Sequence, residues 1–146
     1  MEDLRLHSLA LTNPRGEVSA LFDADEPIHA ELRYRIIHPI RGARMILSLY
    51  TTEGDLAFVC TDHQLHESVV QPGDYCSRFV IPGKLLNRRA YSACPTADAP
   101  GHRHLITTGP HVPFTVGGNA NHLSGFPERW PGVVCPSVAA TLEKTA

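Results

Sequence analysis

The sequence predicts an all-β fold, a two-sheet antiparallel β-sandwich of about seven to nine short strands. The 146 residues include 12 prolines and 11 glycines, spread along the chain, which leaves little room for long helices. Between these residues, short segments alternate apolar and polar side chains with the two-residue period of half-buried strands. The length suits one core, so we expect a single β-sandwich domain over residues 1–146.

The N-terminal part is predicted to hold one strand and a connecting segment. Leu4–Thr12 alternates, but its apolar phase slips near His7, which predicts a β-bulge there. A turn follows at Asn13–Gly16. In the segment after this turn, we expect Leu21 and Phe22 to pack into the core.

Pro27–Ile37 has the clearest alternation and predicts a strand with one buried and one solvated face. The inward phase is Ile28, Ala30, Leu32, Tyr34 and Ile36, and the outward phase is His29, Glu31, Arg33 and Arg35. The chain is then expected to turn at His38–Gly42.

The next two strands, Ala43–Thr51 and Leu56–Thr61, are predicted to form a hairpin around a turn at Thr52–Asp55. Met45, Leu47 and Leu49 form the inward phase of the first strand. Residues 62–71 read as a polar loop.

Pro72–Leu86 contains a further strand that starts after Gly73 and ends at Pro82-Gly83. Its inward phase holds Tyr75, Phe79 and Ile81, and Leu85 and Leu86 return to the core after the strand.

The C-terminal third predicts strands at Arg89–Pro95 and Val112–Val116. Tyr91 and Ala93 are the inward candidates of the first. Residues 96–110 read as a loop, with a short strand at Leu105–Thr108 as the alternative, and Val133–Leu142 as a final extended segment.

Composition and motifs exclude several function classes. The net charge of −2 argues against a broad nucleic-acid surface, and no apolar run is long enough to insert in a membrane. The start of the chain lacks a signal-peptide pattern, so a cytoplasmic location is expected. The four cysteines are widely spaced and read as reduced residues. No nucleotide-binding or nucleophile motif occurs, so we expect no catalysis and no cofactor.

The 9 histidines raise a metal hypothesis. His102 and His104 would share one face of a strand, and His63 and His66 would join them from a loop. No carboxylate motif accompanies them, so solvated loop histidines are the preferred interpretation and no metal site is predicted.

The outward phase of Ala43–Thr51 is less polar than a solvent-exposed surface without a binding role would be. In a sandwich of this kind, Leu56–Thr61 and Arg89–Pro95 lie beside this strand, and their outward phases extend the same face. The resulting patch is Arg44, Ile46, Ser48, Tyr50, Ala57, Val59, Ser92 and Cys94. Such a patch is either a ligand platform or an interface covered by a loop or partner chain. A tyrosine ring suits the C–H face of a sugar, and arginine supplies a forked donor. The candidate carbohydrate-binding residues are Arg44, Ser48, Tyr50, Ser92, His102 and Arg103.

Several motifs occur together in the order of a known family. The first are the Leu4–Gly16 strand and turn, Glu26-Pro27 before a strand ending in Tyr34-Arg35-Ile36, and the Gly54 hairpin. The others are Gly73-Asp74-Tyr75, Phe79-Val80-Ile81-Pro82, Leu85-Leu86-Asn87 followed by Tyr91, Phe114-Thr115-Val116 and Pro131-Gly132-Val133-Val134. With these, the chain resembles the C-terminal domain of the ATP-binding subunit of O-antigen polysaccharide exporters (the Wzt type).

The resemblance implies an immunoglobulin-like antiparallel β-sandwich that binds carbohydrate without catalysis. It implies recognition of the non-reducing end of a surface polysaccharide, and the nucleotide-binding domain of an ABC transporter as a partner at the inner face of the cytoplasmic membrane. It also implies a homodimer. Two other hypotheses remain: a structural or dimerisation domain without its own ligand, and a metal-dependent β-sandwich enzyme.

Overall fold

The structure is a computed structural model, and it describes residues 2–62, 68–100, 103–106, 109–117, 133–134, 141–142 and 144. Within these residues there is no helix, and eleven strands form. The strands are β1 (Leu4–Thr12), β2 (Leu21–Asp23), β3 (Ile28–Ile36), β4 (Ile40–Arg41), β5 (Arg44–Thr51), β6 (Leu56–Asp62), β7 (Val69–Val70), β8 (Gly73–Ile81), β9 (Ala90–Ala99), β10 (Arg103–Ile106) and β11 (Val112–Gly117). The predicted all-β sandwich is confirmed.

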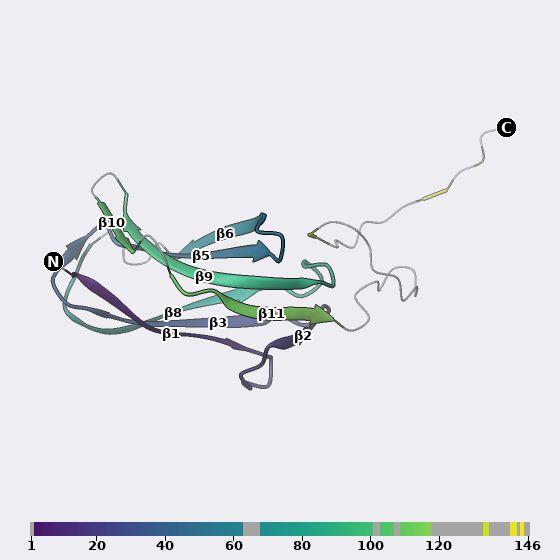
Figure 1. The fold of residues 1–146 in the computed structure, drawn as a ribbon, viewed down its shortest axis with the longest axis horizontal. Helices are drawn as coiled ribbons and strands as arrows, with labels where there is room; N and C mark the ends of the chain where they lie inside the picture. Colours follow the sequence, from purple (N-terminus) through teal and green to yellow (C-terminus); the bar gives the residue numbers. More distant parts are fainter. Residues whose placement is uncertain are drawn as a thin grey trace.

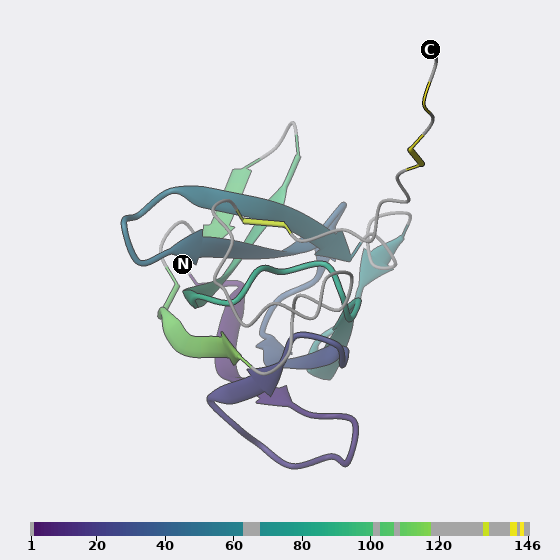
Figure 2. The same ribbon diagram turned by 90° about the vertical axis from the view of Figure 1, so that its right-hand side faces the viewer.

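Two sheets form the layers of the sandwich. The smaller has the order β1-β3-β8, and the larger has the order β2-β11-β9-β5-β6, with β10 paired to β9. Figure 1 shows β5, β6 and β9 on one side and β1, β3 and β8 on the other, and Figure 2 shows the same layers from the end. The pairs within the two sheets are antiparallel except that of β2 with β11, which is parallel. A short pair, β4 with β7, forms a third sheet.

The alternating pattern of β3 places it at the centre of the small sheet. Its five inward residues are each no more than 3% exposed, as predicted. They pack against the inward residues of β5, where Met45, Leu47 and Leu49 are fully buried. Burial of apolar area on this scale is the main stabilising contribution to such a fold.

The predicted β-bulge of β1 is confirmed. The register between β1 and β3 shifts between Leu6 and Ser8, so His7 has no direct partner on β3. This irregularity places the His7 side chain on the outer face of the small sheet, where it lines a hollow described below.

Of the two residues near β2 that were predicted to pack into the core, one does so and the other does not. Phe22 is buried and its ring lies edge-on to Phe114, with the centroids 6.0 Å apart. Leu21 is 66% exposed. The cause is the strand conformation of residues 21–23, because neighbouring side chains of a strand point to opposite faces.

The prediction of a loop at residues 96–110 is also wrong in part. β9 continues to Ala99 and pairs with β10, which starts two residues before the alternative strand of the prediction. Pro95 does not end β9, because the partner strand on that edge of β9 changes at this position from β11 to β10. Ala93 pairs with Val112 of β11 and Ala97 with Ile106 of β10, so Pro95 lies between the two ladders.

A buried polar chain connects the two sheets. The Tyr34 hydroxyl lies 3.0 Å from Ser77 Oγ, and Ser77 Oγ donates to Asp62 Oδ2 at 2.8 Å. Burial raises the pKa of Tyr34. These bonds satisfy hydroxyl groups that would otherwise be costly to bury.

Several predictions fall outside the described residues. They include His63, His66 and His102 and most of the extended segment Val133–Leu142, of which only 133–134 and 141–142 are described. Within the described residues, no helix has the length and apolar character needed to cross a membrane.

Candidate functional site

The predicted patch lies on the outer face of the larger sheet. β5 is flanked by β6 and β9, which is the predicted arrangement. In the register of β5 with β9, Arg44 pairs with Asp98, Ser48 with Cys94 and Tyr50 with Ser92. The patch therefore follows the length of β5.

Tyr50 and Ser92 meet a third residue, His111. The centroids of the Tyr50 and His111 rings are 5.5 Å apart, and the ring planes are tilted by 54°. Ser92 Oγ and His111 Nδ1 are 3.3 Å apart, a hydrogen bond in which the histidine tautomer sets the donor. His111 is exposed, and Tyr50 and Ser92 are half-buried. We call these three residues the Tyr50 platform.

His111 is a residue of this platform that was not predicted from the sequence. A signal was present, because His111 directly precedes the predicted strand Val112–Val116. The register of β11 with β9 places Pro113 opposite Ser92, so His111, two residues earlier and on the same face, lies diagonally across from Ser92. Strand pairing, which periodicity does not provide, was the missing information.

Arg44 lies at the other end of β5. It forms a two-pronged ion pair with Asp98, with Arg44 Nε and Nη2 at 2.9 and 2.8 Å from the carboxylate oxygens. This contact raises the pKa of Arg44. At a rise of about 3.3 Å per residue, Arg44 and Tyr50 are roughly 20 Å apart, more than the width of a single sugar ring. The structure therefore does not bring Arg44 into the Tyr50 platform.

The middle of the patch is covered. Ser48 is only 8% exposed, and Cys94 is buried with its Sγ donating to the Gly109 carbonyl oxygen at 3.6 Å. Ser48 therefore lies largely beneath the surface of the patch. The backbone of Arg103 begins β10 opposite Ala99, at the Arg44 end of the face. His102 is outside the described residues.

The β6 side of the patch differs from the prediction at one residue. The register of β5 with β6 shifts between Leu49 and Tyr50, so Tyr50 pairs with Leu56. Ala57 packs against the core instead of joining the outer face. Leu56 and Val59 are 54% and 48% exposed and form an apolar margin beside Tyr50 and Ser48.

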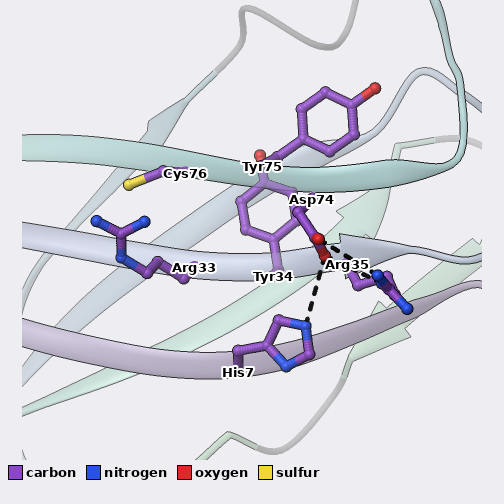
Figure 3. Close-up of a pocket in the computed structure, with 7 residues that line it drawn as sticks. All are labelled: His7, Arg33, Tyr34, Arg35, Asp74, Tyr75 and Cys76. Atoms are coloured by element: carbon purple, nitrogen blue, oxygen red, sulfur yellow. Dashed lines mark hydrogen bonds and ion pairs between the residues drawn. The ribbon is translucent and has the colours of Figure 1, made fainter.

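A second feature lies on the outer face of the small sheet. This is a hollow of about 570 Å³ lined by His7 of β1, by Arg33, Tyr34 and Arg35 of β3, and by Asp74, Tyr75 and Cys76 of β8 (Figure 3). We call it the Arg33 hollow. The outward phase of β3 was predicted as an ordinary solvated face, because alternation alone does not show where a bulge and short side chains leave a depression.

Asp74 is the ionic centre of this hollow. Arg35 Nε and Nη2 donate to its two oxygens at 3.0 and 3.3 Å, and His7 Nε2 lies 3.8 Å from Oδ1. The hydrogen bond and charge of Arg35 hold the pKa of Asp74 below its ordinary value, and the same contact raises the pKa of Arg35. Figure 3 shows the carboxylate between the His7 and Arg35 side chains.

The described residues contain no group of three or more histidine, cysteine or acidic side chains that would hold a metal ion. Three of the four histidines in the metal hypothesis lie outside those residues, and the side chain of the fourth, His104, is not described. The hypothesis is thus neither supported nor tested by the described part of the chain.

Comparisons with known proteins place the fold. No family model matches the sequence, and no curated protein matches it. The crystal structure of the C-terminal domain of Wzt matches with a TM-score of 0.76 at 11% identity, over 98% of this chain and 86% of that one. A β-glucuronidase of Parabacteroides merdae and a β-glucosidase of Listeria innocua, at 14% and 11% identity, match 80% and 76% of this chain but only 14% and 16% of their own, each with a TM-score of 0.47. The chain is thus a β-sandwich with the fold of the C-terminal domain of Wzt, as its sequence motifs predicted.

Proposed function

We propose that this chain is a non-catalytic carbohydrate-binding module for a surface polysaccharide of the O-antigen type, which it recognises at the non-reducing end. The observation that carries the proposal is the Tyr50 platform on the outer face of the larger sheet. The fold and the motif resemblance support the same conclusion.

The platform has the chemistry that a sugar ring needs. The Tyr50 ring offers an apolar face to axial C–H groups, and its hydroxyl offers a polar edge. Ser92 and His111 add a hydroxyl and an imidazole at the border of that ring. The half-buried Tyr50 side chain is held by His111, so little rotamer freedom is lost on binding.

The wider setting of the proposal rests on the resemblance alone. In it, the module works in the cytoplasm as a homodimer, delivers the polysaccharide to the nucleotide-binding domain of an ABC transporter at the membrane, and uses no cofactor. A platform of this size predicts weak binding, with dissociation constants of about 1 μM to 1 mM, or roughly −4 to −8 kcal/mol.

The test is an NMR titration with a panel of O-antigen oligosaccharides, comparing wild type with Tyr50→Ala. We expect shifts centred on Tyr50, Ser92 and His111, and their loss in the variant. Val80→Ala is the control, because Val80 is an exposed apolar residue on the outer face of the other sheet and lies outside both the platform and the hollow. A panel that shifts no resonance of the platform in wild type would contradict the proposal.

A second candidate function is a dimerisation domain without its own ligand. The exposed Leu56 and Val59 on β6 favour it, because paired apolar residues on an edge strand suit an interface. Light scattering of Tyr50→Ala and Val59→Lys separates the two functions. A dimer lost in both variants with unchanged sugar binding supports the dimerisation domain, whereas lost sugar binding in Tyr50→Ala with an unchanged mass supports the module.

A further inference from the structure

We propose that the Arg33 hollow binds a small oxyanion, the carboxylate or phosphate group of a ligand. This site is separate from the proposed carbohydrate platform, because it lies on the outer face of the other sheet. The proposal stands or fails independently of sugar binding at Tyr50.

The hollow exists because Arg33 has short neighbours. In the strand register, Arg33 lies between Ser8 of β1 and Cys76 of β8. The bulge of β1 turns His7 to the border of the same depression. Figure 3 shows the Arg33 guanidinium near Cys76, pointing away from the group formed by His7, Asp74 and Arg35. The Arg33 side chain is 56% exposed, so a ligand reaches it directly.

The charge of this face favours an anion. Its outward side chains on β1, β3 and β8 include four arginines and two carboxylates, although the whole chain has a net charge of −2. Asp74 is neutralised by Arg35. Glu31 is shared, since it lies 3.3 Å from both Arg33 and Arg78. Adding Glu2, which pairs with Arg5, still leaves one positive charge in excess.

Donor groups remain for a ligand. Among the described residues, Arg33 makes one contact, from Nη2 to Glu31, and Arg35 uses Nε and Nη2 on Asp74. A guanidinium carries five N–H donors in a planar fork that matches carboxylate and phosphate oxygens. The Arg33 guanidinium, with four N–H donors outside its contact with Glu31, is therefore the group that would hold one oxyanion.

The oxyanion has two possible sources, a free ion or a charged group on a sugar. The test is an NMR titration of the full chain at low ionic strength with inorganic phosphate, glucose 1-phosphate and glucose, against sodium chloride of matched ionic strength. We expect shifts at His7, Arg33 and Cys76 with both phosphates and none with glucose or chloride. If glucose 1-phosphate binds more tightly than inorganic phosphate, the site is supported and its ligand is a charged sugar. If the two bind equally, the site is supported and it recognises the phosphate group alone.

Three variants test the assignment of the residues. Arg33→Gln should weaken phosphate binding by roughly tenfold, because it removes a charge-assisted hydrogen bond. Glu31→Gln should strengthen binding, because it releases Arg33 and Arg78 from their shared carboxylate. Arg15→Gln is the matched control, since Arg15 pairs with Glu17 and Glu26 away from the hollow.

The exposed position of Arg33 means that Arg33→Gln should keep the fold, which a thermal unfolding curve checks. Phosphate binding should be unchanged in Tyr50→Ala, whatever that variant does to sugar binding. The proposal is overturned if phosphate moves no resonance of the hollow, or if Arg33→Gln binds phosphate as well as Arg15→Gln does. It is equally overturned if Glu31→Gln fails to tighten binding.

Discussion

The centroid of the His111 ring lies 5.5 Å from that of the Tyr50 ring, and His111 Nδ1 lies 3.3 Å from Ser92 Oγ. His111 therefore contacts two neighbouring strands of the larger sheet, β5 and β9. His111→Ala should therefore lower sugar affinity by about three- to tenfold, since aromatic contacts contribute about 0.5–1.5 kcal/mol. Isothermal titration calorimetry measures the change. His29→Ala, a histidine on the outer face of the small sheet, is the control and should bind as wild type. Equal affinities of the two variants would remove His111 from the site.

The buried hydroxyl of Ser77 is the link in the chain from Tyr34 to Asp62. Ser77→Ala removes one hydrogen bond from each of these residues and should destabilise the fold by about 1–3 kcal/mol. Tyr34→Phe should cost less, because it leaves the Ser77–Asp62 bond in place. Urea denaturation gives both values, with Ser92→Ala as the half-exposed control. A loss in Ser77→Ala no larger than that in Ser92→Ala would show that the chain contributes little to stability.

The strands of this protein were predictable because their side chains alternate over long runs. β3 shows this most clearly, since its five inward residues are the five that the pattern assigns. Short elements such as β2 and β4 were not predictable, because two or three residues show no period. The end of β9 was predicted wrongly at Pro95, because proline usually ends a strand. Here Pro95 lies between the residues of β9 that pair with β11 and those that pair with β10, so the strand continues.

The candidate site was less predictable than the fold. Tyr50 and Ser92 were found because the outward phases of adjacent strands are visible in the sequence. The pairing of Arg44 with Asp98 depends on the register of β5 with β9. The contact of His111 with Ser92 and the burial of Ser48 and Cys94 depend on the segment Gly109–His111 that precedes β11. Such contacts are long-range, and the sequence pattern contains no direct record of them.

Arg44 and Asp98 form a half-buried pair that supports the sheet and not the platform. We expect Arg44→Met to leave sugar affinity at Tyr50 unchanged, because the two residues are separated by roughly 20 Å along β5. A double-mutant cycle with Asp98→Asn should give a coupling energy of about 0.5–1.5 kcal/mol, above the range of a fully exposed pair. A clear loss of sugar affinity in Arg44→Met would restore Arg44 to the binding site.

The Arg35–Asp74 contact should give the protein a component of acid sensitivity. The pKa of Asp74 is depressed in the folded state, mainly by its hydrogen bond with Arg35. Its contribution to stability is therefore present above the unfolded pKa of about 3.9 and is lost as the pH falls through the lower folded value. NMR titration of the Asp74 carboxyl should show this depressed pKa in wild type and a higher one in Arg35→Gln. The same pKa in both proteins would contradict this cause.

Gly109 connects the fold of the larger sheet to the Tyr50 platform. A β-carbon at Gly109 would collide with the backbone carbonyl of Pro95, and the Gly109 carbonyl accepts the bond from Cys94. Gly109→Ala should therefore push the chain away from β9 and move His111, which is two residues further on. We expect a loss of stability of about 1–3 kcal/mol together with weaker sugar binding.

Gly117→Ala is the matched control for this variant. Its new β-carbon would meet only the Leu21 side chain at 3.7 Å, an ordinary contact. Thermal unfolding and calorimetric titration of both variants separate local displacement from a general effect of alanine. If Gly109→Ala keeps wild-type stability and affinity, the close approach to Pro95 does not position His111. If it loses stability but keeps affinity, the platform forms without help from this contact, and Tyr50 with Ser92 is then sufficient to hold the imidazole in place.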